Sequence, residues 1–371
     1  MRSYKPIIFA PSIEEGGVEK NLFLISNFLS KYLKNLSIIT ANTNKKKCFD
    51  KRINFLSPKS SFFVNKNRLI KSLICLIILL KQILKNKNRV SIISFQGNVF
   101  AIIFAIIFRL KIIVRSNSSP EGWASNYIKK KLFYLLFSQA NLVVVNSREF
   151  KLKMKNLLNI NAINIYNPLD KKIILKKSKQ KIKFDFFKKK SLNLISIGRL
   201  TNQKDHLTLL KAVKNVKDKI NLKLVIIGKG EKKGEILNFI ERYKLSNCIK
   251  FLGYKNNPYP YLRMSDCLVL TSKYEGLPNV LLEAMCLKKF TISTKCPTGP
   301  KEILLNGKLG YLFNISDFKA LSKLLLKYAK IKKINKSYLN RTVNNGFKSL
   351  ERFNFEKNCR LYLKSINKIL F

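Results

Sequence analysis

Two carboxylates eight positions apart carry the clearest chemical signal in this chain. Glu275 and Glu283 lie within the segment EGLPNVLLEAM, in which Pro278-Asn279 is typical of a helix start. The pattern predicts that Glu275 lies in a loop after a strand and that Glu283 lies about one turn into the following helix. The backbone N–H groups of that helix start, which lie between the two carboxylates, can bind a phosphate.

Two cations occur earlier in the sequence, also between a strand pattern and a helix pattern. Arg199 and Lys204 follow the apolar run at 192–197 and come just before the helical pattern at 206–216. At the end of a parallel strand and beside a helix N-terminus, they would form an anion site suited to a diphosphate. In a chain so rich in lysine, the same two residues also fit ordinary surface charge.

The elements that must position these residues alternate along the chain. β-Branched runs predict strands at 5–10, 37–40, 91–94, 112–115, 142–146, 163–165, 192–197, 223–227, 249–251, 267–270 and 290–293. Helical patterns fall at 18–32, 68–85, 99–109, 127–138, 148–158, 206–216, 234–244, 280–287 and 318–328. This alternation predicts α/β domains, each a doubly wound parallel sheet that binds ligands at the carboxyl ends of its strands.

The length of 371 residues fits two such domains. We expect an N-terminal domain over 1–167 and a C-terminal domain over 191–350, whose start alternatively lies as early as residue 168. The lysine-rich segment 168–190 between them has little periodicity and fits a solvated linker or, alternatively, a binding arm. Residues 351–371 are expected to form a C-terminal helix that can pack back on the N-terminal domain.

The charge of the chain points to anionic partners. Lysine and arginine total 73 against 20 acids, a formal net charge of +53, and such a surface attracts phosphates, anionic lipid or nucleic acid. The apolar runs are too short to span a bilayer. The segment 66–89, in which basic residues bracket an apolar centre, fits either a helix in a membrane interface or a helix buried against the sheet.

Metal and disulfide chemistry are disfavoured by the residue types. The seven cysteines are scattered without a C-x-x-C pair, which argues for a reducing compartment, and His206 is the only histidine. No D-x-D occurs, so enzymes that hold a diphosphate through a metal on paired aspartates are also disfavoured. We expect no metal cofactor.

With these motifs in view, the sequence resembles glycosyltransferase family 4, whose members are retaining enzymes of the GT-B fold. The family's E-x7-E element is matched by Glu275 to Glu283, and its G-R-L…K element by Gly198 to Lys204. The other matching segments follow in the family's order: EGGVEK (15–20), VVVNSREFK (143–151), YNPLD (166–170), LVIIGKGE (224–231), FLGY (251–254) and TGPKEIL (298–304).

The resemblance implies two Rossmann-like domains facing across a cleft, with a nucleotide-sugar donor held mainly by the C-terminal one. It implies that Arg199 and Lys204 grip the donor diphosphate, that Glu283 accepts from the ribose hydroxyls and that Glu275 binds the donor sugar near the reacting carbon. The implied catalytic residues are Glu275, Arg199 and Lys204. The implied donor-binding residues are Gly16, Gly17, Gly198, Arg199, Lys204, Gly253, Tyr254, Glu275, Gly276, Leu277, Pro278, Asn279 and Glu283.

Two parts of this assignment leave alternatives open. Gly16 and Gly17 either let the backbone approach the donor or make an ordinary tight turn. Many relatives carry a histidine that contacts the donor sugar, whereas the matching stretch here, residues 114–120, contains none. Arg115 or Asn117 would then take over this contact with the donor sugar or the acceptor. His206 begins a helix, and we expect a structural role for it.

The expected function is therefore transfer of a hexose or N-acetylhexosamine from a UDP-sugar to a lipid-linked saccharide, polyprenyl or glycolipid, in polysaccharide, capsule or lipopolysaccharide synthesis. The resemblance places such an enzyme in the cytoplasm, on the anionic inner face of the cytoplasmic membrane. The alternatives are transfer to a soluble acceptor or a nucleotide-sugar epimerase of the same fold. A nucleic-acid-binding protein is a distant alternative, because no recognised RNA- or DNA-binding motif accompanies the charge, and no nucleic-acid partner is expected.

Overall fold

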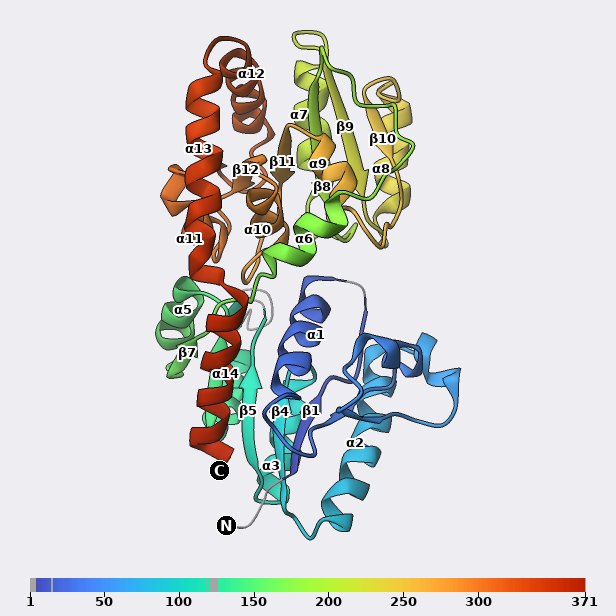
Figure 1. The fold of residues 1–371 in the computed structure, drawn as a ribbon, viewed down its shortest axis with the longest axis vertical. Helices are drawn as coiled ribbons and strands as arrows, with labels where there is room; N and C mark the ends of the chain where they lie inside the picture. Colours follow the sequence, from blue (N-terminus) through green and yellow to red (C-terminus); the bar gives the residue numbers. More distant parts are fainter. Residues whose placement is uncertain (1–4, 15, 118, 121–125, 371) are drawn as a thin grey trace. The chain divides into compact units, whose positions relative to one another are not determined.

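The computed structural model describes residues 5–14, 16–117, 119–120 and 126–370. The chain divides into two compact units, each built around its own parallel β-sheet (Figure 1). Unit 1 comprises Met1–Pro168 together with Phe355–Phe371, and unit 2 comprises Leu169–Asn354. The predicted α/β class with two Rossmann-like domains is confirmed. None of the helices in the described ranges is both long and apolar enough to cross a bilayer.

Unit 1 contains a seven-stranded sheet in the order β3-β2-β1-β4-β5-β6-β7, in which every paired neighbour is parallel. Its strands are β1 (Lys5–Phe9), β2 (Ser37–Ile39), β3 (Asn54–Leu56), β4 (Val90–Ser94), β5 (Lys111–Arg115), β6 (Leu142–Val145) and β7 (Ala162–Asn164). The central strands are β-branched and almost wholly buried, as expected for a sheet covered on both faces.

Two layers of helices cover this sheet. One layer is formed by α2 (Arg68–Lys85), α3 (Asn98–Ile107), α4 (Tyr127–Phe137) and α5 (Arg148–Leu158), which share one apolar core with alternate strand residues. The opposite layer is formed by α1 (Gly17–Leu29) and α14 (Phe355–Leu370), which share a second core with the intervening strand residues. Right-handed crossovers produce this division, because the strand order reverses direction between β1 and β4.

Unit 2 contains a six-stranded parallel sheet in the order β10-β9-β8-β11-β12-β13. Its strands are β8 (Leu192–Ile197), β9 (Leu222–Ile227), β10 (Ile249–Phe251), β11 (Cys267–Leu270), β12 (Phe290–Thr294) and β13 (Tyr311–Phe313). The strand order reverses between β8 and β11. In doubly wound folds, the loops that follow the two strands at this reversal form the usual ligand site.

The helices of unit 2 lie on both faces of its sheet. They are α6 (Lys171–Ser178), α7 (His206–Val216), α8 (Lys233–Arg242), α9 (Tyr259–Met264), α10 (Asn279–Cys286), α11 (Pro300–Ile303), α12 (Phe318–Ile334) and α13 (Lys336–Ser349). Helices α7, α8 and α12 share the main core of the unit with the sheet. Helix α10 contacts β11 and β12, and α6 packs against both α9 and α10.

The segment 168–190, expected to be a linker, differs from that expectation. Part of it forms α6, which Asp170 caps by accepting a hydrogen bond from the backbone N–H of Ile173 at 3.0 Å. Ile174, on the inner side of this helix, is buried. The lysines lie mostly on the exposed side of α6, and their number obscures its amphipathic pattern in the sequence. Unit 2 begins at Leu169 and not at residue 191.

Helix α14 returns the end of the chain to unit 1 (red in Figure 1). It contacts α1 and β5, and its side chains Cys359, Tyr362 and Ile366 are buried in the second core. The first and last residues of unit 2, Leu169 and Asn354, form a parallel β-bridge with each other. Unit 1 is therefore discontinuous in sequence, whereas unit 2 is continuous.

Candidate active site

The strongest polar cluster of unit 2 lies at the reversal point of its sheet. The loop after β8 contains Gln203 and Lys204, and the loop after β11 contains Thr271 and Lys273. These loops are bonded directly to each other, because the Lys273 N–H donates to the Gln203 carbonyl at 2.8 Å and the Thr271 hydroxyl donates to the Lys204 carbonyl at 2.9 Å. The fold thus brings two segments about seventy residues apart to one edge of the sheet.

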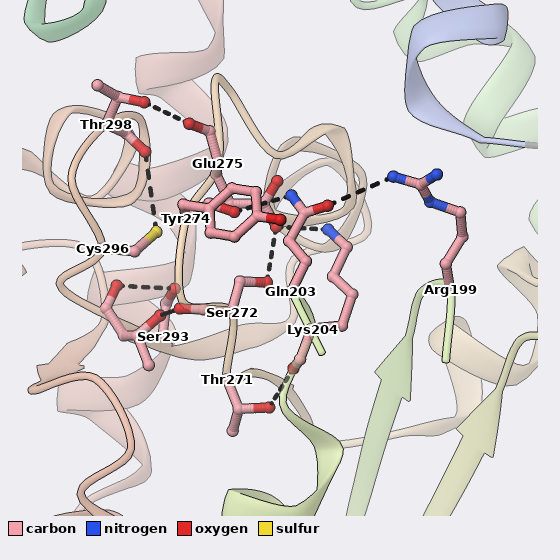
Figure 2. Close-up of polar contacts among 11 residues, drawn as sticks. Arg199, Gln203, Lys204, Thr271, Ser272, Tyr274, Glu275, Ser293, Cys296 and Thr298 are labelled. Carbon is pink, nitrogen blue, oxygen red and sulfur yellow. Dashed lines mark hydrogen bonds and ion pairs between the residues drawn. The ribbon is translucent and has the colours of Figure 1, made fainter. Parts of the chain in front are cut away.

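Lys204 and Glu275 form an ion pair within this cluster (Figure 2). Their side chains are 15% and 9% exposed, so the two charges compensate each other in a largely water-excluded place. The Ser272 hydroxyl donates to the same Glu275 carboxylate oxygen at 2.7 Å, and the Thr298 hydroxyl donates to the Glu275 backbone carbonyl at 2.5 Å. The carboxylate is therefore held from its own loop, and the backbone of Glu275 is held from the loop after β12.

Two unusual backbone conformations shape these loops. Asp205 adopts a left-handed conformation with φ 45° and caps α7, where its carboxylate accepts from the Thr208 hydroxyl at 2.8 Å. Gly299 has φ +91°, and a Cβ there would lie 2.6 Å from the Gly276 carbonyl oxygen. Only glycine lets this loop approach the turn that carries Glu275 so closely.

Arg199 is exposed and reaches the turn through an intermediate residue. Its guanidinium donates to Gln203 Oε1 at 3.4 Å, and Gln203 Nε2 donates to the Tyr274 carbonyl at 2.9 Å (Figure 2). The structure therefore brings together all three predicted catalytic residues, with Lys204 in direct contact with Glu275. Gln203 was not identified from the sequence, although it lies inside the motif that contains Arg199 and Lys204.

Glu283 lies on α10, one turn after its start at Asn279, as the sequence predicted. Its side chain is buried, and Oε1 accepts a hydrogen bond from the Tyr259 hydroxyl at 3.1 Å. Tyr259 begins α9 and was not identified from the sequence. The residues Gly276, Leu277 and Pro278 are buried in the turn before α10, and the N-terminus of this helix adds a partial positive charge beside Glu275.

The remaining predicted donor residues occupy loops of both units. Gly198 directly follows β8, and its backbone lies against that of Gly228, which follows β9. A Cβ on Gly228 would lie 1.8 Å from the Gly198 carbonyl oxygen. Tyr254 follows β10, is 39% exposed and lies under the ammonium of Lys229, with Gly253 beside it at φ +66°. The two glycines Gly16 and Gly17 belong to unit 1, where they start α1.

Arg115 requires a correction. We expected it or Asn117 to contact a sugar, but the Arg115 side chain is only 1% exposed and bonds within unit 1. Its guanidinium donates to Asn117 Oδ1 at 2.8 Å, to Asn167 Oδ1 at 2.6 Å and to the Tyr362 hydroxyl. Burial lowers the pKa of the Arg115 guanidinium and raises the pKa of Tyr362 to about 12. Arg115 therefore fixes α14 and the end of unit 1, and Asn117 is one of its partners.

His206 lies beside the site but is not part of its surface. It is 4% exposed at the start of α7, and its Nδ1 has no hydrogen-bond partner in the described part of the chain. Burial, with Lys204 nearby, lowers the pKa of His206 from 6.5 to about 4. Protonation of this imidazole is therefore more favourable in the unfolded chain than in the folded one.

This shift predicts that stability falls as the pH drops through the range from 6.5 to 4. At pH 5, His206 should lower the free energy of unfolding by about 2 kcal/mol relative to pH 8. The His206→Leu variant should lose this part of the pH dependence, because the sequence contains no other histidine. Urea unfolding of both proteins at the two pH values measures the difference. If the free energy of unfolding changed equally with pH in the wild type and the variant, His206 would not titrate in this way.

The cluster has the chemistry of an anion site with a carboxylate beside it. Lys204, Arg199 and the start of α10 supply positive charge, and Glu275 can accept hydrogen bonds from hydroxyl groups. Across the described residues, no group of three or more histidine, cysteine, aspartate or glutamate side chains is arranged to hold a metal ion.

Sequence comparisons agree with this chemistry. A family model described as glycosyl transferases group 1 matches residues 176–349, which include the whole cluster. An uncharacterized glycosyltransferase of Methanocaldococcus jannaschii is 33% identical over 296 residues, covering 69% of this chain and 71% of that protein. The amylovoran biosynthesis glycosyltransferase AmsD of Erwinia amylovora is 29% identical over 311 residues, covering 81% and 84%.

A third relative acts on a lipid-linked substrate. It is the N-acetylgalactosamine-N,N'-diacetylbacillosaminyl-diphospho-undecaprenol 4-alpha-N-acetylgalactosaminyltransferase of Campylobacter jejuni, 26% identical over 245 residues, covering 64% of each chain. Among solved structures, that of HepE from Anabaena in complex with UDP and glucose superimposes with a TM-score of 0.78 at 18% identity. It covers 98% of this chain and 99% of HepE, a likeness that shows the common GT-B fold.

The identity to the archaeal relative over more than two thirds of both chains establishes the family. The group 1 match to unit 2 and the named transferases among the relatives agree with it. This chain belongs to the glycosyl transferases group 1 family, and the protein is a glycosyltransferase.

Proposed function

We propose that this glycosyltransferase is a retaining enzyme of family 4 that moves a hexose or N-acetylhexosamine from a UDP-sugar to a lipid-linked saccharide without a metal ion. The observation that carries the proposal is the Lys204–Glu275 pair at the reversal point of unit 2. The UDP in the HepE complex supports the choice of nucleotide, and the diphospho-undecaprenol substrate of the Campylobacter relative supports a polyprenyl-linked acceptor. Such an acceptor puts the enzyme at the inner face of the cytoplasmic membrane.

The ion pair suggests how the donor engages the site. A diphosphate carries more negative charge than a carboxylate, so it competes successfully with Glu275 for the Lys204 ammonium. Arg199, exposed at the edge of the site, binds the same diphosphate from the other side. Glu275, still held by Ser272, then accepts hydrogen bonds from hydroxyls of the donor sugar.

The same groups favour the chemical step. As the bond between the anomeric carbon and the diphosphate oxygen breaks, negative charge grows on the diphosphate and positive charge on the sugar. Lys204, Arg199 and the α10 N-terminus stabilise the first, and the Glu275 carboxylate stabilises the second. The acceptor hydroxyl attacks the same face of the sugar and passes its proton to the departing phosphate, so that the configuration is retained without a protein nucleophile.

Ligand binding tests the donor assignment. UDP-sugars at about a hundredfold above their dissociation constants should raise the melting temperature by about 5 °C, because they bind only the folded state. GDP-sugars serve as the matched controls and should shift it much less. An equal shift with both nucleotides would contradict the preference for uridine.

Metal independence is tested in the same preparation by assaying transfer of labelled sugar to a short-chain polyprenyl diphosphate saccharide. Excess EDTA should leave the initial rate unchanged, and adding magnesium back should have no effect. A rate that falls with EDTA and returns with magnesium would refute the metal-independent mechanism while leaving the transferase assignment intact.

A further inference from the structure

Three neighbouring helices of unit 1 carry half of the large apolar side chains that the described part of the chain leaves exposed. On α2 these residues are Leu69, Ile70, Leu73, Ile77 and Leu84; on α3 they are Ile103, Ile106 and Ile107; and on α4 they are Tyr127, Ile128, Leu132, Tyr134 and Leu135. We refer to this set as the α2–α4 face. Exposed apolar clusters of this extent are uncommon on soluble monomers and mark interaction sites.

The exposure is not needed to build the domain core. Helix α2 already buries Cys75, Leu79 and Ile83 against the sheet, while Leu73 and Ile77, on the opposite side, are 57% and 50% exposed. The helix is therefore apolar on both sides, unlike an ordinary surface helix with a polar outer face. Of the two interpretations of the segment 66–89, packing against the sheet holds for one side of the helix, and the membrane interpretation stays open for the exposed side.

The three helices present their exposed sides in a common direction. All of them contribute to the core on one face of the seven-stranded sheet, and α3 contacts both α2 and α4. Their exposed residues consequently point away from the same face of the sheet. Helix α4 is the extreme case, because Phe137 is its only buried residue, whereas Tyr127 and Ile128 are 78% and 76% exposed.

The charged side chains of α2, α3 and α4 themselves are all basic, and Glu14 pairs with one of them, Arg68, at the start of α2 at 2.7 Å. Residues 66–120 and 126–147 contain no aspartate or glutamate, and exposed basic residues stand beside the apolar ones, including Lys81 on α2 and Lys129 and Lys131 on α4. An apolar surface whose border is mainly basic complements a bilayer whose headgroups are anionic. A protein partner would need an equally one-sided acidic rim around an apolar surface.

We propose that the α2–α4 face inserts into the interface of an anionic bilayer, with its leucine and isoleucine side chains at the level of the headgroups and upper acyl chains. The inference rests on the proposed lipid-linked acceptor and deepens it by naming the surface that carries the enzyme to that acceptor. The basic residues contribute long-range attraction, and the aliphatic residues contribute the part of the affinity that salt does not screen.

Flotation of the full chain with phosphatidylglycerol–phosphatidylcholine vesicles tests the proposal. The Leu73→Gln/Ile77→Gln and Ile128→Gln/Leu132→Gln variants should each lower the partition coefficient by at least about tenfold, because they remove apolar insertion without changing the net charge. The Leu237→Gln/Ile334→Gln variant is the matched control, since it removes two exposed apolar residues from unit 2 and should bind like the wild type. The Lys129→Gln/Lys131→Gln variant should weaken binding mainly at low salt.

Three outcomes would overturn the proposal: no binding of the wild type, equal binding of all variants, or a dimer that the Ile128→Gln/Leu132→Gln variant dissociates. The last would identify the α2–α4 face as a contact between copies of this chain. Vesicle binding is measured without donor or acceptor, and transfer to a detergent-soluble acceptor is measured without vesicles. A failure of membrane binding is therefore distinguishable from a failure of the proposed reaction.

Discussion

The Glu275→Ala and Lys204→Ala variants should each lower kcat/KM for sugar transfer by roughly a thousandfold, while the protein stays folded. Each substitution removes one member of the ion pair and thereby a charge aimed at the separating sugar and diphosphate. The two effects should differ in kind. Loss of Lys204 weakens binding of UDP itself, whereas loss of Glu275 leaves UDP binding intact and lowers the rate from bound donor.

The chain offers a close control for this experiment. Lys273 lies in the same loop but is exposed, so the Lys273→Ala variant should retain nearly full activity and UDP affinity. The Glu275→Gln variant keeps an acceptor for the Ser272 hydroxyl but removes the negative charge, and it should remain severely impaired. Wild-type activity in Glu275→Ala or Lys204→Ala would refute the site, provided that circular dichroism shows the variant to be folded.

The Arg115→Ala variant should lower the free energy of unfolding of unit 1 by about 4 kcal/mol. It removes the guanidinium hydrogen bonds to the buried oxygens of Asn167 and Tyr362, and it opens a cavity next to Phe95. Thermal unfolding measures the loss, and limited proteolysis should show α14 cut well before the rest of the chain. The rate of sugar transfer is measured separately from stability, because no described contact joins Arg115 to the polar cluster of unit 2.

Arg360 provides the control on the same helix. It is exposed and pairs with Glu356 at 2.6 Å, and water and salt screen such an ion pair on a helix surface so that it contributes little to stability. The Arg360→Ala variant should therefore unfold almost like the wild type. If Arg115→Ala lost no more stability than Arg360→Ala, the buried hydrogen bonds would not be what holds α14 in place.

Most elements could be predicted because their signals are local. The β-branched runs gave the strands of both sheets to within a few residues, and caps such as Ser147 and Asn67 mark helix starts that the sequence shows directly. The short strands β3 (NFL) and β13 (YLF) were missed because neither contains a β-branched residue. Helix α6 was missed because its lysines outweigh the few apolar residues that pack against α9 and α10.

The candidate site likewise has residues that local sequence patterns flank and contacts that only the folded structure shows. Strand ends and helix starts in the sequence flank Glu275, Lys204 and Arg199, and the family resemblance supplied the roles expected for them. The direct contact between Lys204 and Glu275 was not predictable, and neither was the support from Ser272 and Thr298, because both depend on how loops from three strands meet. The expectation for Arg115 was wrong for the same reason, since its partner Tyr362 lies 247 positions along the chain.

The return of α14 to unit 1 has a consequence for biosynthesis. A ribosome completes β1–β7 long before it reaches residues 355–370, and at ordinary translation rates unit 2 takes roughly 10–40 s to emerge in between. During that interval the layer that α14 shares with α1 is incomplete, and the Arg115 guanidinium lacks its tyrosine partner. We therefore expect unit 1 to complete its fold only after unit 2 has been synthesised.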